Sequence, residues 1–166
     1  MKWEVSLTSN KAGGLLLMWD NNVISVENIL KTRRWICLDM YILQEGFRCS
    51  LCLLYAPNDQ RDRAIFWDQL RMLYYELATP IIFMGGFNEV LPLEERKHAT
   101  RLTLSMREFG DWVQNLGLVD IKTQNKKFTW RRANSASKLD EFFVAHEWLV
   151  MPVVRKSHSL ITWASS

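Results

Sequence analysis

The sequence has no long apolar run and few residues that break regular structure. No apolar stretch approaches the roughly 18 residues that a membrane-spanning helix needs, and the opening segment "MKWEVSLTSNKAGG" lacks the apolar centre of a signal peptide. We therefore expect an intracellular protein, in the nucleus or cytoplasm, without membrane contact. With 7 glycines and 4 prolines in 166 residues and no repeat or linker, the chain is expected to form one domain over residues 1–166.

Cysteines are also few, and their number is odd. Of the three, Cys49 and Cys52 lie three residues apart in a strand-like segment, so their side chains should face opposite sides of a sheet. This spacing suits neither a disulfide nor a pair of metal ligands. The pattern predicts reduced, partly buried thiols.

The chain has little excess charge, because 21 basic residues face 18 acidic ones for a net charge of +3. This balance does not by itself indicate a nucleic-acid-binding protein. Cations do gather at residues 31–34, 95–101 and 125–132, and the last run also contains Phe128 and Trp130. Basic loops with aromatic side chains suit phosphates and bases, but solvated loop charge explains the same runs equally well.

Apolar residues make up 48% of the chain, enough for a sizeable core. Strand patterns occupy residues 14–19, 23–30, 35–43 and 47–55, which favours an antiparallel meander. A helix follows, capped by Asn58 or Asp59, and its inward residues are expected to be Ile65, Phe66, Leu70, Leu73, Tyr74 and Leu77.

Residues 81–84 form a buried strand pattern that ends at Gly85 and Gly86. A second helix is predicted near Leu104 to Leu116 and ends at Gly117. Its expected inward residues are Met106, Phe109, Trp112, Val113 and Leu116. Further strands are expected in "LVDI", "KFTWRR", "SKLDEFFV" and "VVRKSHSLITW". Many strands with two separated helices indicate two packed sheets with helices outside.

A set of short motifs occurs in a recognisable order. These are "GGLLLMWD", "YAPND" followed by Arg61, "FMGGFNEVLPLEER", "FTW", "SKLDEFFV" and a late "SHS". In sequence and spacing they resemble the endonuclease/exonuclease/phosphatase superfamily, and most closely the endonuclease domain of non-LTR (LINE-type) retrotransposons. The resemblance covers nearly the whole chain from Gly13. It implies a DNase I-like, four-layered α/β sandwich, in which two mostly antiparallel sheets are flanked by helices.

The resemblance also implies a chemistry, the Mg²⁺-dependent hydrolysis of DNA phosphodiesters. It places Tyr55 and Asn58 near the phosphate and makes Asn88 a donor to the developing oxyanion. The remaining positions that it implies are Asp140 as the partner of a catalytic His158, and Arg61 as a substrate contact. Independently of the resemblance, Trp130 is expected to contact nucleic acid, because it lies among the cations of residues 125–132.

Without the motif order, these same residues have ordinary structural explanations. Tyr55 would be a core or rim residue, Asn58 a helix cap and Asn88 a turn residue. Asp140 would form a surface pair with Lys138.

The sequence departs from the family pattern at three places. Gly86 stands where the Gly-Asp-x-Asn pattern has its aspartate, and Ser157 precedes His158 where the family has Ser-Asp-His. The amino-terminal strands that carry an asparagine and the metal-binding glutamate are lacking, and Glu4 is the sole carboxylate before Gly13. No metal ligand is therefore assigned, although the resemblance implies Mg²⁺.

These departures favour an inactive, truncated endonuclease-like remnant of a retroelement. Two alternatives remain open: an active metal-dependent nuclease or phosphodiesterase with a rearranged site, and a non-catalytic nucleic-acid-binding module.

Overall fold

The computed structural model describes residues 1–7, 14–91, 101–121, 130–132, 135–137, 140–150 and 161–165. Its helices are α1 (Gln60–Glu76), α2 (Leu104–Asn115) and the short 3-10 helix η2 (His146–Val150). Its strands are β1 (Lys2–Leu7), β2 (Gly14–Trp19), β3 (Ile24–Lys31), β4 (Trp35–Ile42), β5 (Phe47–Tyr55), β6 (Ile81–Gly86), β7 (Leu118–Asp120), β8 (Trp130–Arg132), β9 (Ser135–Ser137), β10 (Asp140–Ala145) and β11 (Ile161–Ser165).

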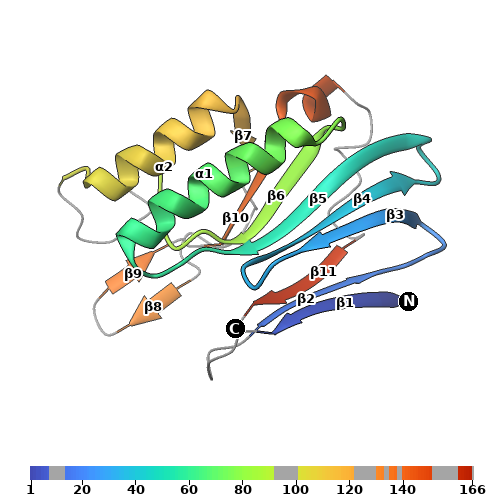
Figure 1. Ribbon diagram of the computed structural model, residues 1–166, viewed down its shortest axis with the longest axis horizontal. Coiled ribbons are helices and arrows are strands. Elements are labelled where there is room, and N and C mark those ends of the chain that lie inside the picture. Colours follow the sequence, from blue (N-terminus) through green and yellow to red (C-terminus); the bar gives the residue numbers. More distant parts are fainter. Residues whose placement is uncertain are drawn as a thin grey trace.

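Two sheets pack against each other, and helices cover the outer face of the larger one (Figure 1). The larger sheet has the order β3-β4-β5-β6-β10-β7, and the smaller has the order β1-β2-β11. α1 and α2 lie on one face of the larger sheet and the smaller sheet lies on the other (Figure 1). Neighbouring strands are antiparallel except β5 and β6, which α1 connects as a parallel pair. The expected α/β sandwich of mostly antiparallel sheets is confirmed, whereas β1 was not among the predicted strands.

α1 lies over the larger sheet through one apolar stripe. Asp59, rather than Asn58, is its N-cap, and the Asp59 side chain accepts from the backbone N–H groups of Arg61 and Asp62. The buried residues of the helix are Arg63, Phe66, Trp67, Leu70 and Leu73. The prediction that Ile65 points inward is wrong, because its side chain is 59% exposed. It falls outside the stripe that residues 63, 66, 67, 70 and 73 define at helical spacing.

α2 follows its predicted pattern closely. Thr103 is the N-cap, and its hydroxyl accepts from the backbone N–H of Met106 at 3.1 Å. All the predicted inward residues are buried. Gly117 has a φ of 62° and terminates the helix, because a left-handed residue at this place is favourable mainly for glycine.

An aromatic cluster joins both helices to the sheet and fixes the loop after β6. The ring of Trp67 stacks on that of Phe109 at 5.0 Å between centroids and lies 6.1 Å from that of Phe87. Phe87 in turn meets Phe143 of β10 edge to face at 5.1 Å. Because Phe87 is fully buried, it anchors the chain between Gly86 and Asn88 in the core.

The three cysteines are free and buried. Cys52 lies directly opposite Cys37 in the β4–β5 ladder, and Cys49 lies opposite Met40. Burial, followed by the charge of Asp39, raises the pKa of Cys49 to about 12. The Cys49 thiol is therefore protonated and unreactive in the folded protein at neutral pH.

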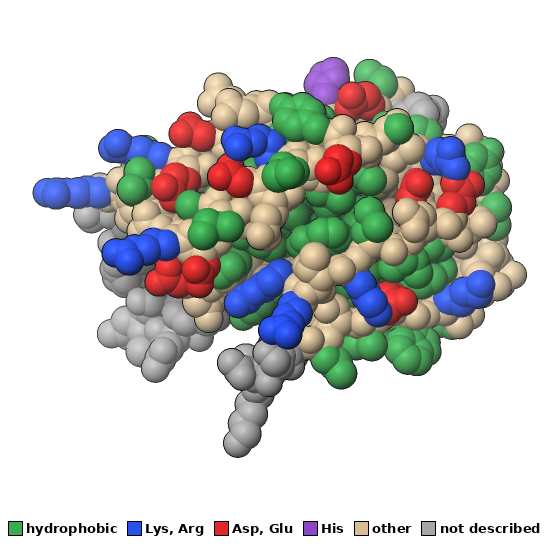
Figure 2. Space-filling view, viewed as in Figure 1, with side chains coloured by type: hydrophobic (Ala, Val, Ile, Leu, Met, Phe, Trp, Pro, Cys, Tyr) green, Lys and Arg blue, Asp and Glu red, His purple; other side chains and the backbone are tan. Residues whose placement is uncertain are grey.

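On the face that carries α1, the described side chains show no field of one charge (Figure 2). Lys and Arg side chains alternate with Asp and Glu side chains over the face that carries α1 (Figure 2). No helix within the described ranges combines the length and the hydropathy needed to cross a bilayer.

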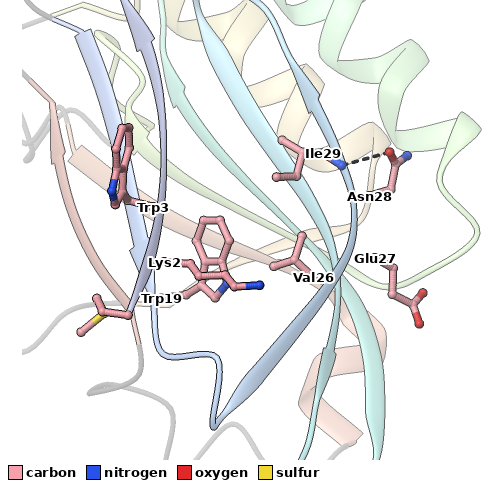
Figure 3. A pocket seen from close by; sticks show the side chains of 8 residues that line it. Lys2, Trp3, Trp19, Val26, Glu27, Asn28 and Ile29 are labelled. Carbon is pink, nitrogen blue, oxygen red and sulfur yellow. Dashed lines mark hydrogen bonds between the residues drawn. The ribbon is translucent and has the colours of Figure 1, made fainter.

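A groove of about 560 Å³ opens between the edges of the two sheets (Figure 3). Its lining residues are Met1, Lys2, Trp3, Trp19, Val26, Glu27, Asn28 and Ile29. The Asn28 side chain is held locally, because its Oδ1 accepts from the backbone N–H of Ile29 at 3.0 Å. Tyr55, Asn58, Arg61 and Asn88, the predicted site residues whose side chains are described, do not line this groove.

Candidate functional site

Three strands bring predicted site positions into one row at an end of the larger sheet. Tyr55, the last residue of β5, is in register with Gly86, the last residue of β6. Gly86 is also in register with Asp140, the first residue of β10. Beyond the row, the backbone N–H of Ala56 donates to the carbonyl of Gly86 at 2.7 Å. The position without a carboxylate therefore lies between Tyr55 and the backbone of Asp140.

The two adjacent glycines of β6 have different structural roles. Gly85 has a φ of 122°, and a Cβ added to it would lie 2.2 Å from the carbonyl oxygen of Leu54. The turn thus requires glycine at position 85, both for its backbone angle and for the close approach of β5. Among the described glycines, positive φ angles occur at Gly46, Gly85 and Gly117 but not at Gly86. The φ angle at position 86 therefore does not require glycine.

Asn58 and Asn88 meet next to this row. Asn88 has a φ of 53°, a left-handed conformation that asparagine tolerates better than most residues. Its Nδ2 donates to the carbonyl of Ala56 at 2.5 Å and to Oδ1 of Asn58 at 3.1 Å. Both N–H bonds of Asn88 Nδ2 are thereby used within the site. Since Oδ1 of Asn58 accepts, its exposed Nδ2 is the amide group that can donate to a ligand.

A buried arginine connects the two asparagine loops. Nη1 of Arg63 donates to the carbonyls of Pro57 at 3.2 Å and Asn58 at 2.6 Å. Its Nη2 donates to Oε2 of Glu89 at 3.3 Å and to Oγ of Ser105 in α2 at 2.8 Å. Arg63 is 8% exposed and Glu89 is 1% exposed, so this ion pair lies inside the protein. It fixes residues 57–58 against residues 88–89 and α2.

The remaining predicted residues are placed only in part. Arg61 is exposed in the first turn of α1. The backbone of Trp130 pairs with Ser137 in the β8–β9 ladder. His158, like Lys126 and Lys127 of the basic run, lies outside the described residues.

The described residues do not fit a magnesium ion. Nowhere in the described ranges do three or more His, Cys, Asp or Glu side chains gather closely enough to hold a metal. Glu89 points into its ion pair with Arg63. Glu4 lies in β1 and pairs with Nζ of Lys31 at 2.5 Å, and this hydrogen bond lowers the pKa of the Glu4 carboxyl. Mg²⁺ prefers carboxylate oxygens, and the part of the row described with side chains offers none.

The role of Arg63 was not predicted from the sequence, although its position in the helical pattern indicates burial. An arginine at the start of a stripe with Phe66, Trp67 and Leu70 has the spacing of a buried helix face. A charge at such a position needs a buried partner. Glu89, which follows the asparagine of the next motif, is that partner here.

No family model matches the sequence, and no curated protein matches it significantly. Solved structures, by contrast, match well in shape. The endonuclease domain of TRAS1, a telomere-specific non-LTR retrotransposon, superposes with a TM-score of 0.66 at 15% identity, over 89% of this chain and 68% of that one. ANGEL2, a 2',3'-cyclic phosphatase, gives a TM-score of 0.58 at 13% identity, over 87% of this chain and 62% of that one.

An endonuclease/exonuclease/phosphatase family protein from Bacteroides thetaiotaomicron gives a TM-score of 0.52 at 14% identity. The match covers 76% of this chain and 52% of that one. Taken together, these likenesses show that the chain has the endonuclease/exonuclease/phosphatase fold. The chain spans between about half and two thirds of the length of these three structures.

Proposed function

We propose that the chain is a degenerate, retroelement-derived endonuclease-like domain that does not carry out metal-dependent hydrolysis. The observation that carries the proposal is the row at the end of the larger sheet. Gly86 occupies its centre, in register with Tyr55 on one side and Asp140 on the other. Glycine has no side-chain oxygen with which to orient water or bind a metal ion.

The origin in a retroelement is supported by the order of the sequence motifs. It is also supported by the likeness in fold to the endonuclease domain of TRAS1. The loss of hydrolysis is supported by Ser157 beside His158, in addition to Gly86. One positioned acid–base group contributes about 10²- to 10⁴-fold to a rate, and groups that act as a unit fail together.

A second function, weak binding of nucleic acid without hydrolysis, is favoured by the asparagine pair. Nδ2 of Asn88 donates to Oδ1 of Asn58 and so leaves Nδ2 of Asn58 as the outward amide donor. An amide donor of this kind suits a phosphate oxygen. Binding through phosphates is independent of sequence and weakens as the salt concentration rises.

The test of the proposed loss of hydrolysis is the nicking of supercoiled plasmid by the purified chain in the presence of Mg²⁺ or Mn²⁺. We expect no nicking above the buffer control and no thermal stabilisation by either ion. We also expect that Gly86→Asp alone restores nothing, because Ser157 still stands where the family pattern has a second aspartate. Gly86→Ala is the matched control, since it adds a side chain at the same place without a carboxylate.

One outcome overturns the proposal: nicking by the unmodified chain that a chelator and His158→Ala both abolish. The converse experiment restores the missing groups. A chain with Gly86→Asp, Ser157→Asp and a grafted amino-terminal strand pair bearing asparagine and glutamate should recover Mg²⁺-dependent nicking.

A further inference from the structure

The row at the end of the larger sheet has a fourth member that the sequence motifs do not include. The backbone N–H of Tyr55 donates to the carbonyl of Arg34 at 2.9 Å, which extends the antiparallel β4–β5 ladder by one position. Arg34 is thus directly opposite Tyr55, and side chains paired in this way project from the same face of a sheet. The row therefore runs from Arg34 through Tyr55 and Gly86 to Asp140.

The turn that carries Arg34 is fixed by hydrogen bonds from both sheets. Oγ1 of Thr32 accepts from the backbone N–H groups of Arg34 at 3.1 Å and Trp35 at 3.2 Å. From the smaller sheet, Oγ of Ser6 donates to the carbonyl of Thr32 at 2.5 Å. The position of Arg34 relative to Tyr55 is therefore set by the fold.

Arg34 supplies a positive charge that no described residue neutralises. The neighbouring Lys31 pairs with Glu4 at 2.5 Å. By contrast, Arg34 is a half-buried residue whose guanidinium makes no hydrogen bond or ion pair with any residue in the described ranges. Asp59, four residues after Tyr55 in the chain, is occupied as the cap of α1. A guanidinium offers paired N–H donors that match the oxygens of a phosphate.

We propose that Arg34 binds a backbone phosphate of nucleic acid at this row, together with the amide of Asn58. Strands lie about 4.8 Å apart, so Arg34 and Gly86 are about 10 Å apart on either side of Tyr55, and one phosphodiester can lie across the row. Gly86 presents no carboxylate to repel it. The choice of nucleic acid as the ligand rests on the proposed function. The inference adds that binding needs no divalent ion.

The test measures binding and nicking separately on the same samples. A fluorescently labelled DNA duplex is titrated in the presence of chelator at low and moderate salt, and anisotropy gives the affinity. Arg34→Gln should weaken binding about tenfold, which corresponds to the loss of one charge-assisted hydrogen bond. It should also reduce the slope of log K against log salt by about 0.9.

Two further variants make the measurement specific. Arg48→Gln removes the same charge at the opposite end of β5, where Arg48 forms an exposed pair with Glu27, and it should bind like the wild type. Arg34→Lys should keep the salt slope and lose only part of the affinity, because lysine keeps the charge without the paired donors. Circular dichroism and the melting temperature confirm that each variant is folded.

A second readout does not need a substitution. In NMR spectra, addition of dimethyl phosphate should shift the Nε–H resonance of Arg34 and the side-chain amide resonance of Asn58. Equal affinities of Arg34→Gln and Arg48→Gln, or no binding by the wild type, would overturn the inference. Plasmid nicking would instead overturn the proposed function, and the role of Arg34 would stand if Arg34→Gln still bound more weakly.

Discussion

Replacing Arg63 with methionine tests the buried network that holds the two asparagine loops together. Arg63→Met keeps an unbranched side chain of similar length but removes every N–H donor to Pro57, Asn58, Glu89 and Ser105. The carboxylate of Glu89, 1% exposed, then loses its ion pair with Arg63. Removing one partner of a buried pair costs about 3–5 kcal/mol, because the other charge stays desolvated.

This loss is a large share of the total stability of a domain, which is about 5–15 kcal/mol. For a domain of this size, each kcal/mol lowers the melting temperature by about 2–4 °C, so we expect a decrease of roughly 6–20 °C. Urea unfolding followed by tryptophan fluorescence gives the free energy directly, since Trp67 lies in the core beside Arg63 on α1.

The matched control is Arg71→Met on the same helix. Arg71 pairs with Asp68 at 2.7 Å, but both side chains are at least half exposed, so the expected change is below about 1 kcal/mol. The double variant Arg63→Met/Glu89→Gln should recover part of the loss, because it removes the buried charge that Arg63 no longer balances. If Arg63→Met and Arg71→Met were equally stable, the buried network would not contribute to stability and our reasoning would be refuted.

Three further predictions concern the fold around the site. Gly85→Ala should destabilise the protein by at least about 2 kcal/mol, because the φ of 122° at this position is strained for alanine and the new Cβ would lie 2.2 Å from a carbonyl oxygen. Gly86→Ala, measured in the same urea titration, should lower the free energy of unfolding clearly less. The thiol of Cys49 should react with a thiol reagent only after unfolding. Because its pKa is raised from 9.0 to about 12, the stability it contributes is complete below pH 9 and is lost as the pH rises from 9 towards 12, which denaturant titrations across this window would detect. Thr103→Ala should cost about 1 kcal/mol through the lost cap of α2, whereas Thr103→Ser should be nearly neutral.

Periodicity was enough to predict the elements whose apolar residues repeat regularly. Both long helices and the strands from β2 to β6 lie where the patterns place them, within one or two residues. β1 was missed because its pattern is weak: Trp3 and Leu7 are exposed, and Ser6 is the buried residue. A strand of this kind is defined by its pairing with β2, which local sequence does not encode.

The site was harder to predict than the fold, because its contacts join distant parts of the chain. Motif order identified Asn58 and Asn88, but it did not reveal that one orients the other. Arg34 belongs to the row only through the register of β4 with β5, and register follows from tertiary packing. Arg63 was missed because a single arginine in a sequence is most often a surface residue.

The strand order of the larger sheet has a consequence for how the chain folds during translation. β10 lies between β6 and β7, although it follows both of them in the sequence. Until β10 is synthesised, the apolar strand β6 keeps one edge of unpaired backbone groups, and β7 has no neighbour in the sheet. A nascent chain that ends before Asp140 thus exposes a surface that chaperones recognise and that promotes aggregation. The strand that brings Asp140 to the row is also the one that pairs with the free edge of β6, so the row forms only when that edge is covered.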